Sequence, residues 1–299
     1  MSMRFDGRVA IVTGAGQGLG RCHALALAAR GAKVVVNDLG CGGAPSESTQ
    51  SVVEEILAAG GEALANGADV TNADEVASMV TETEARWGKV DILVNNAGIL
   101  RDKTFGNMAL ADFELVVKVH LIGSAIVTRA VWNGMRQRSY GRVVLTSSAS
   151  GIYGNFGQAN YGAAKAGMIG LMNVLHLEGA KYNITVNTLA PTAMTAMTEG
   201  LLPPDAAAVL TPQSVSAAVL FLASDDAPSR VIMGAGAGVF AVTHIAETPG
   251  VYLNEAERTP EQIAARFAEI SDRATAVPLE NALQQTFKFA TTALNAVAK

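Results

Sequence analysis

Residues 8–20, R-V-A-I-V-T-G-A-G-Q-G-L-G, contain the stretch that decides the fold. The run 8–12 is rich in β-branched and aliphatic residues, which predicts a short buried strand that breaks into a glycine-rich loop. An Ala- and Leu-rich helical pattern follows to Arg30, and residues 33–38 resume a buried strand. Because glycines between a strand and a helix let backbone amides approach a pyrophosphate, this unit predicts a dinucleotide site. The loop residues expected to contact the cofactor are Gly14, Gln17, Gly18, Leu19 and Gly20.

Asp38 closes the second strand, about 20 residues beyond the glycine-rich loop. A carboxylate at this point can accept hydrogen bonds from the adenosine ribose hydroxyls and would repel a 2′-phosphate. The sequence therefore favours NAD over NADP. The alternative is an ordinary turn aspartate. Asp69 and Val70 follow an expected strand at 63–65 and are placed to border the adenine.

Strand and helix patterns continue to alternate beyond Asp38. Residues 74–87 show an amphipathic helical pattern, and residues 90–94 read as a buried strand that ends in N-N-A-G. The alternation predicts an α/β fold with a doubly wound parallel sheet, a Rossmann architecture of about seven strands. We expect an NAD-binding domain over residues 1–240 and a helical C-terminal extension over 241–299, packed on the same domain or on a partner subunit.

Composition narrows the function classes. The chain has 299 residues, 49% of them hydrophobic, which is ample for a buried core. The charged fraction is 16%, the net charge is −5 and no Lys/Arg run occurs, so neither nucleic acid nor a membrane surface is expected as a partner. Cys22 and Cys41 stand apart from any Cys/His cluster, which argues against a metal site or a disulfide framework. With no room for a signal peptide before the first strand, we expect a cytoplasmic protein.

Residues 148–165, S-A-S-G-I-Y-G-N-F-G-Q-A-N-Y-G-A-A-K, predict the chemistry. Tyr161 and Lys165 are spaced i, i+4, so on a helix they project from one face. A cation beside a phenol favours the phenolate and lowers its pKa towards working pH, as an acid or base for an alcohol/ketone pair requires. Ser148 follows the apolar run 142–146 and would lie at a strand's carboxyl end, where ligands bind in open α/β sheets. A solvated helix face with a chance Tyr-x-x-x-Lys is the alternative.

The motifs T-G-A-G-Q-G-L-G, N-N-A-G, Ser148 and Y-G-A-A-K resemble, in this order and spacing, the short-chain dehydrogenase/reductase superfamily, through about residue 240. The resemblance implies that Ser148, Tyr161 and Lys165 perform proton transfer coupled to hydride transfer, and that the protein is a homodimer or homotetramer. It also implies that a threonine downstream of Pro191 touches the nicotinamide, and Thr192, Thr195 and Thr198 stay open for that role. The further cofactor contacts expected are Asn96, Ala97, Gly98, Tyr161, Lys165, Pro191 and Thr195.

His120 departs from the superfamily pattern. The superfamily motif N-L-x-G reads H-L-I-G at residues 120–123, within an expected helix at 114–136. The usual asparagine anchors a water in the proton relay to Lys165, and a neutral imidazole could serve similarly. The alternative is a histidine that only hydrogen-bonds within a helix kink. An apolar loop from Thr192 to Pro204 is expected either to cover the active site or to join the core.

Four stretches are similar, more narrowly, to the (3R)-hydroxyacyl-CoA dehydrogenases of type 2 peroxisomal multifunctional enzymes. They are N-D-L-G, N-N-A-G-I-L-R-D, V-H-L-I-G-S and T-S-S-A-S-G-I-Y-G-N-F-G-Q-A-N-Y. This resemblance implies oxidation of a (3R)-hydroxyacyl-CoA to the 3-oxoacyl-CoA in fatty-acid oxidation. One alternative is a 3-oxoacyl or hydroxysteroid dehydrogenase/reductase, but such reductases usually need NADPH, which Asp38 disfavours. The other alternative is an NAD-binding regulatory protein without catalysis.

Overall fold

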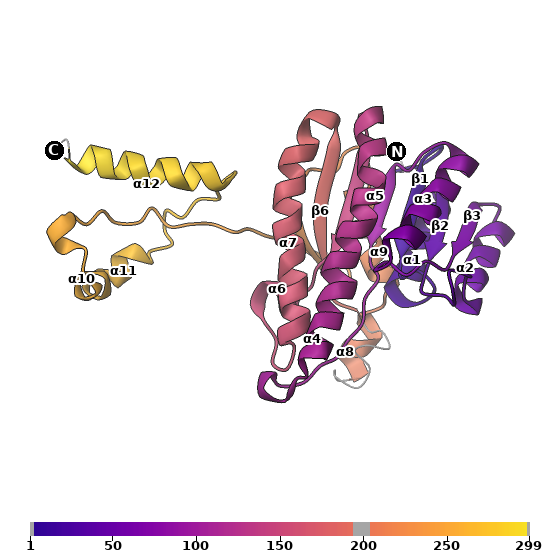
Figure 1. Cartoon of the computed structure of the whole chain (residues 1–299), viewed down its shortest axis with the longest axis horizontal. Coiled ribbons are helices and arrows are strands. Elements are labelled where there is room, and N and C mark those ends of the chain that lie inside the picture. Colours follow the sequence, from indigo (N-terminus) through magenta and orange to yellow (C-terminus); the bar gives the residue numbers. More distant parts are fainter. Residues whose placement is uncertain (1–2, 194–203, 298–299) are drawn as a thin grey trace. The chain divides into compact units, whose positions relative to one another are not determined.

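A computed structural model describes residues 3–193 and 204–297 of the chain (Figure 1). The chain divides into two compact units, Met1–Val242 and Thr243–Lys299. Among the described residues, no helix has both the length and the apolar character needed to cross a bilayer. The same residues bring together no group of three or more His, Cys, Asp or Glu side chains that could hold a metal ion.

The first unit is built on one sheet with the strand order β3-β2-β1-β4-β5-β6-β7-β8. The pairs from β3 through β7 are parallel, which confirms the predicted doubly wound architecture. The strands are β1 Val9–Thr13, β2 Lys33–Asn37, β3 Glu62–Asn66, β4 Ile92–Asn95, β5 Gly141–Thr146, β6 Ile184–Pro191, β7 Ile232–Gly236 and β8 Val239–Thr243.

Strand β8 is the addition to the expected sheet of about seven strands. It follows β7 after the two residues Ala237 and Gly238, whose φ angles of 50° and 77° are both positive. Two positive φ angles in a two-residue connection are typical of a type I′ turn, so β7 and β8 form a hairpin. The sequence A-G-A-G around this turn lacks the alternating pattern that announces a strand, and the hairpin was therefore not predicted.

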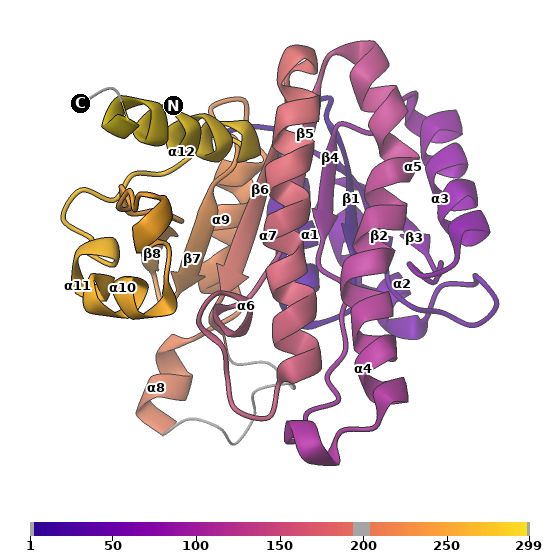
Figure 2. The ribbon, with the colours of Figure 1, turned by 60° about the vertical axis from the view of Figure 1, so that its left-hand side comes forward.

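Helices cover both faces of the sheet, with α3, α5 and α7 over one face and α1 and α9 over the other (Figure 2). Strand residues alternate between two apolar clusters: Ala10 and Val12 pack with α1 and α9, whereas Ile11 packs with α3, α5 and α7. The helices of this unit are α1 Gly18–Ala28, α2 Glu47–Ala58, α3 Ala73–Trp87, α4 Leu110–Val117, α5 Gly123–Arg138, α6 Ala149–Tyr153, α7 Ala159–Gly179, α8 Pro204–Val209 and α9 Gln213–Leu222.

The second unit contains the short helices α10 Pro260–Ala265 and α11 Phe267–Ile270 and the longer α12 Ala282–Val297. Thr259 caps α10, because its side chain accepts a hydrogen bond from the amide of Gln262 at 3.3 Å. Lys288 of α12 forms an ion pair with Glu247 and donates to the Thr248 carbonyl oxygen at 2.7 Å.

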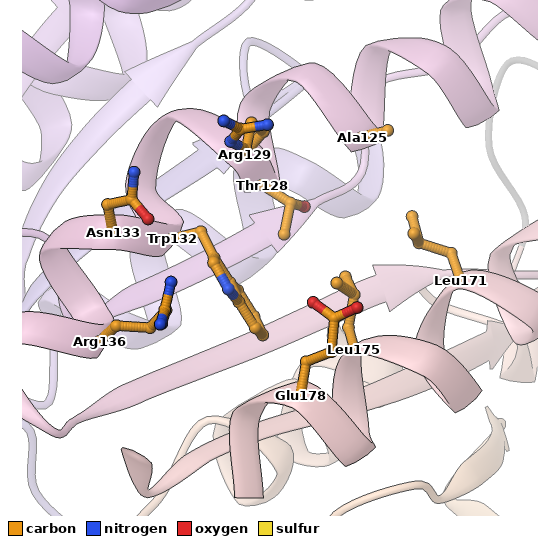
Figure 3. A pocket seen from close by; sticks show the side chains of 9 residues that line it. All are labelled: Ala125, Thr128, Arg129, Trp132, Asn133, Arg136, Leu171, Leu175 and Glu178. Atoms are coloured by element: carbon orange, nitrogen blue, oxygen red, sulfur yellow. The ribbon is translucent and has the colours of Figure 1, made fainter. Parts of the chain in front are cut away.

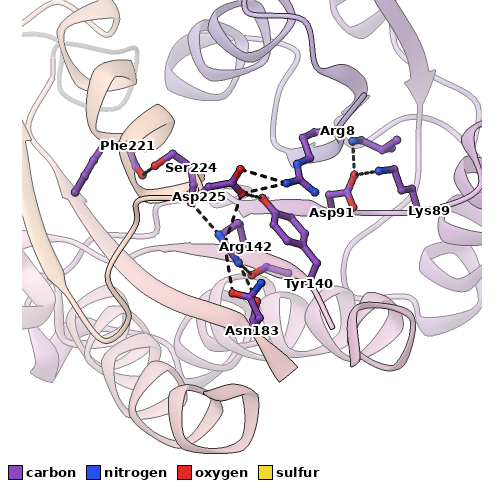
Figure 4. Close-up of polar contacts among 11 residues, drawn as sticks. Arg8, Lys89, Asp91, Tyr140, Arg142, Asn183, Phe221, Ser224 and Asp225 are labelled. Atoms are coloured by element: carbon purple, nitrogen blue, oxygen red, sulfur yellow. Dashed lines mark hydrogen bonds and ion pairs between the residues drawn. The ribbon is translucent and has the colours of Figure 1, made fainter. Parts of the chain in front are cut away.

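A polar cluster ties the first unit together at the amino ends of its strands (Figure 4). Arg142 is the second residue of β5 and is buried, and its guanidinium donates to the carbonyl oxygens of Ser224, Gly141 and Asn183 at 2.8, 2.8 and 2.9 Å. The Tyr140 ring centroid lies 3.6 Å from Arg8 Cζ and 4.3 Å from Arg142 Cζ.

Tyr140 completes this cluster, since its hydroxyl donates to Asp225 at 2.6 Å. Burial, together with the bond to Asp225, raises the pKa of Tyr140 well above its usual value, so the hydroxyl stays a neutral donor. Ser148 lies beyond the carboxyl end of β5, and the cluster at the amino end therefore supports the fold from the edge opposite to the predicted chemistry.

Replacing Arg142 with Met should lower the free energy of unfolding by roughly 3–5 kcal/mol, because three backbone carbonyl oxygens lose their donor and Asp225 loses one of its ion-pair partners. Urea unfolding followed by circular dichroism measures this loss. Arg4→Met is the control, since Arg4 pairs with Asp6 at the surface and should change stability by about 0.5 kcal/mol or less. Equal effects of the two substitutions would show that the buried cluster does not hold the sheet.

Candidate active site

The glycine-rich loop runs between β1 and α1 and leaves no space for side chains at two positions. Gly14 has φ +63°, and a Cβ there would lie 2.7 Å from the Cα of Ala97. A Cβ at Gly20 would lie 2.1 Å from the carbonyl oxygen of Gly14. The N-cap residue of α1, Gln17, makes no side-chain capping bond, so it leaves the first amides of the helix available to a ligand. This loop fits a pyrophosphate group.

Strands β1 and β4 lie side by side, although they are not consecutive in the sequence, which makes their carboxyl edge the switch point of the sheet. The Thr13 hydroxyl accepts hydrogen bonds from the amides of Asn96 at 3.0 Å and Ala97 at 3.1 Å. In return the Asn96 side chain donates to the carbonyl oxygens of Thr13 and Gly14. The predicted contact residue Asn96 thus holds the loop in shape, and Ala97 closes against Gly14.

Asp38 is fixed at the end of β2, beside the loop. One carboxylate oxygen accepts the amide of Gly16 at 2.8 Å and the other accepts the amide of Leu39 at 2.8 Å. The side chain is partly exposed, so its remaining lone pairs can bind the hydroxyls of a ribose. Farther along the same edge, Asp69 accepts the amide of Thr71 at 2.8 Å. The residues present therefore fit the adenosine half of a nicotinamide dinucleotide.

The structure brings together Ser148, Tyr161 and Lys165. Ser148 caps α6 by accepting the amide of Ser150 at 3.1 Å, and its hydroxyl hydrogen-bonds to the phenol oxygen of Tyr161. Lys165 is buried one turn farther along α7, with its Nζ 5.5 Å from the centroid of the Tyr161 ring. The ammonium donates to the Thr146 carbonyl oxygen at 2.6 Å. The predicted set thus forms one site at the carboxyl edge of β5.

The expected direction of the Tyr161 pKa is wrong for this state of the protein. Burial raises the pKa of the phenol, the hydrogen bond from Ser148 lowers it, and the negative charge of Asp102 raises it. Burial also lowers the pKa of Lys165 to about 7, so the ammonium is only partly charged near neutral pH. The physical reason is that excluding water disfavours both charged forms, and the spacing of Tyr161 and Lys165 in the sequence does not report this.

His120 occupies a π-helical turn, Lys118–Ile122, which separates α4 from α5 and replaces the continuous helix expected at 114–136. Its Nε2 lies 2.8 Å from the carbonyl oxygen and 3.1 Å from the amide nitrogen of Ile99. Burial, and then the charge of Lys165, lower the pKa of His120 to about 3, so the imidazole is neutral.

The His120 ring also approaches the catalytic group. It meets the Tyr161 ring edge-on, with centroids 5.2 Å apart and planes at 85°. The ring packs so closely against Gly98 that a Cβ there would lie 2.1 Å from Cε1. Within the described part of the chain, the buried Nδ1 has no hydrogen-bond partner. The hydrogen bond between Nε2 and Ile99 supports the structural interpretation, and the relay role of the unpartnered Nδ1 stays a prediction.

Some expected contacts cannot be placed. Thr195 lies outside the described residues, as do Thr198 and the methionines of the predicted apolar loop. Pro191 ends β6 and is partly exposed at the same edge as Ser148. Sequence reasoning missed Thr13, whose signal is its place directly before the first glycine, and it missed Asp102, which lies in the quoted stretch N-N-A-G-I-L-R-D.

A separate cavity of about 270 Å³ lies on the outer side of the helix layer, between α5 and α7 (Figure 3). Trp132 and Arg136 of α5 face Glu178 of α7 across it. It contains none of the catalytic residues predicted from the sequence. The cavity is therefore not the reaction site.

Comparison with known proteins agrees with this geometry. The sequence profile described as short chain dehydrogenase matches residues 8–205. The chain is 44% identical over 275 residues to peroxisomal multifunctional enzyme A of Dictyostelium discoideum, covering 90% of this chain but only 61% of that protein. It is 46% identical over 270 residues to a putative short-chain type dehydrogenase/reductase of Mycobacterium tuberculosis, covering 89% of this chain and 94% of that protein.

A solved structure is also similar. The full-length peroxisomal multifunctional enzyme type 2 from Drosophila melanogaster matches with a TM-score of 0.82 and 37% identity, covering 97% of this chain and 49% of that chain. The chain thus spans 61% and 49% of the lengths of these two multifunctional relatives. With the family profile, the identities and the site in agreement, the chain belongs to the short-chain dehydrogenase family and is an oxidoreductase.

Proposed function

We propose that the protein oxidises a (3R)-hydroxyacyl-CoA to the 3-oxoacyl-CoA with NAD as cofactor. The observation that carries this proposal is the convergence of Ser148, Tyr161 and a buried Lys165 at the carboxyl edge of β5, the same sheet edge as the glycine-rich loop. Similarity to peroxisomal multifunctional enzymes supports the choice of acyl-CoA. Asp38 supports the choice of NAD, since its carboxylate would repel the additional phosphate of NADP.

The chain's own residues supply the proton chemistry. Ser148 and Tyr161 can both bond the oxygen of a secondary alcohol, and Tyr161 accepts the hydroxyl proton as its phenolate. A nicotinamide dinucleotide held by the glycine-rich loop and Asp38 would supply the acceptor for the hydrogen that leaves carbon, with its electron pair, as hydride. Below its pKa of about 7, Lys165 places a positive charge 5.5 Å from the centroid of the Tyr161 ring. Because the pKa of Tyr161 is raised, the ionised form becomes more abundant as pH rises, and oxidation should be faster at alkaline than at neutral pH.

We infer that a second copy of the chain covers the outer cavity between α5 and α7. Val174 and Leu177 leave 53% and 48% of their surfaces exposed on α7, next to this cavity. Arg136 on one helix and Glu178 on the other offer opposite charges to the same surface of a second copy. A homodimer or a homotetramer built on it is the proposed assembly.

Replacing Tyr161 with Phe deletes only the phenolic oxygen. Turnover should fall by about 100-fold or more, while the affinity for NAD stays close to that of the unmutated protein. Steady-state kinetics and equilibrium NAD binding measure the two quantities. Tyr182→Phe is the matched control, because the Tyr182 hydroxyl lies at the surface and bonds Arg136. Substantial turnover in Tyr161→Phe would mean that the proton leaves by another route.

The His120 variants separate the relay role from the structural one. If Nδ1 anchors a relay water, His120→Ala should lower kcat by about 10-fold with little change in NAD affinity. His120→Asn should restore much of the loss, since an amide can bond a water similarly. The melting temperature of each variant reports the stability that is lost with the hydrogen bond between His120 and Ile99. A kcat unaffected in a folded His120→Ala variant would leave the histidine a structural role alone.

The substrate proposal is tested by stereochemistry. With NAD, the (3R)-hydroxyacyl-CoA should react and the (3S) isomer should not, because hydride must leave from the carbon face that points at the nicotinamide while Ser148 and Tyr161 hold the oxygen. A hydroxysteroid assayed in parallel tests the alternative that the protein is a hydroxysteroid dehydrogenase. Preference for the (3S) isomer, or turnover confined to steroids, would contradict the assignment while leaving the protein a dehydrogenase.

A further inference from the structure

Gln158 joins two segments that border the catalytic tyrosine. It is the N-cap residue of α7, three positions before Tyr161, and it uses its side chain on other segments rather than on the helix. Its Nε2 donates to a carboxylate oxygen of Asp102 at 2.6 Å. Its Oε1 accepts the Ser150 hydroxyl at 2.7 Å and the Asn155 amide at 3.0 Å. One side chain thus connects the loop after β4 with the segment that follows β5.

Ser150 connects Gln158 with Ser148 through two hydrogen bonds. The amide of Ser150 bonds the Ser148 hydroxyl at 3.1 Å, while its own hydroxyl bonds Gln158. Ser148 in turn bonds the phenol of Tyr161. The chain of contacts therefore begins and ends on α7 and passes through α6. A shift of Gln158 would move Ser148 relative to Tyr161.

Asp102 anchors the other side of Gln158. The loop that carries it lies along the start of α7: the amide of Lys103 donates to the Gly157 carbonyl oxygen at 2.9 Å. The Asn160 side chain donates to the Arg101 carbonyl oxygen at 3.0 Å and accepts the amide of Tyr161 at 2.7 Å. These backbone contacts fix where the Asp102 carboxylate stands, although the side chain itself is exposed.

Among the described residues, four groups act on the Tyr161 phenol from the elements around it. Ser148 of the β5–α6 turn donates to it, Lys165 of α7 lies beside the ring, and His120 of the π-helical turn meets the ring edge-on. His120 is neutral and Lys165 is only partly charged near neutral pH. Asp102 is the group in this set that brings a negative charge, and its field acts against ionisation of the phenol.

We propose that Asp102 and Gln158 are positioning residues for the reaction. Gln158 holds Ser148 against Tyr161 through Ser150, and Asp102 both anchors Gln158 and places a fixed negative charge near the phenol. The inference rests on the proposed role of Tyr161 as proton acceptor. The pH at which the enzyme begins to oxidise alcohols is then set in part by the Asp102 carboxylate, in addition to Ser148, Tyr161 and Lys165.

Asp102→Asn separates the charge from the hydrogen bond, because asparagine keeps an oxygen that can accept from Gln158. The rising limb of kcat against pH should move to lower pH, so that turnover on this limb increases about two- to fivefold, a modest factor because solvent screens an exposed charge. At high pH, where kcat no longer changes with pH, Asp102→Asn and the unmutated protein should have the same kcat. Asp112→Asn is the matched control. Asp112 lies 4.0 Å from Arg101, so this substitution removes one negative charge from a neighbouring segment.

Gln158→Met keeps the size of the side chain and removes its hydrogen bonds. It should lower kcat by about 10-fold or more across the pH range, as expected when a reacting group is misplaced, with unchanged equilibrium NAD affinity. A Gln158→Met variant with the kcat of the unmutated protein would overturn the positioning role.

A readout without turnover distinguishes failure of this inference from failure of the proposed substrate. In protein labelled with ¹³C at the tyrosine Cζ, the Tyr161 resonance is identified by its loss in Tyr161→Phe, and its shift reports ionisation against pH. Its midpoint should move to lower pH in Asp102→Asn and stay in place in Asp112→Asn. An unchanged midpoint, or equal movement in both variants, would overturn the charge role whatever substrate the enzyme uses.

Discussion

The parallel pairing of β1 with β4 is the constraint on which the site depends. It places the end of one strand beside the end of another that is distant in sequence, so the Thr13 hydroxyl can bond the amides of Asn96 and Ala97. Gly14 then passes so close to Ala97 that a Cβ does not fit. Once this edge is fixed, the loop that fits a pyrophosphate, the carboxylate of Asp38 and the catalytic residues beyond β5 lie along one side of the sheet.

Exclusion of water sets the acid–base behaviour of the site. Burial keeps His120 neutral, lowers the pKa of Lys165 to about 7 and raises the pKa of Tyr161. These effects all oppose charge, whereas the hydrogen bond from Ser148 favours the phenolate. The polar groups around the phenol therefore act on its pKa through their positions as well as their charges, and the proposed positioning role of Gln158 rests on its contacts with Ser150 and Asp102.

Local pattern in the sequence predicted the strand–helix alternation, the catalytic spacing and the glycine-rich loop, because each rests on residues near one another in the chain. The π-helical turn at His120 and the hairpin that adds β8 have no such signal: the first interrupts a continuous helical pattern, and the second lies in a stretch rich in glycine. The direction of the Tyr161 pKa and the bond from Gln158 to Asp102 depend on burial and on segments 56 residues apart, so they required the folded structure.

The proposed function requires that this edge of the sheet bind NAD and that Asp38 select NAD over NADP. Isothermal titration calorimetry of both cofactors against the unmutated protein and Asp38→Ala measures this selection. The unmutated protein should bind NAD more tightly than NADP. Asp38→Ala should weaken the binding of NAD by about 10-fold and narrow the difference in affinity between the two cofactors, since it removes both the ribose hydrogen bonds and the repulsion of the 2′-phosphate. Equal affinities for the two cofactors in the unmutated protein would contradict the account.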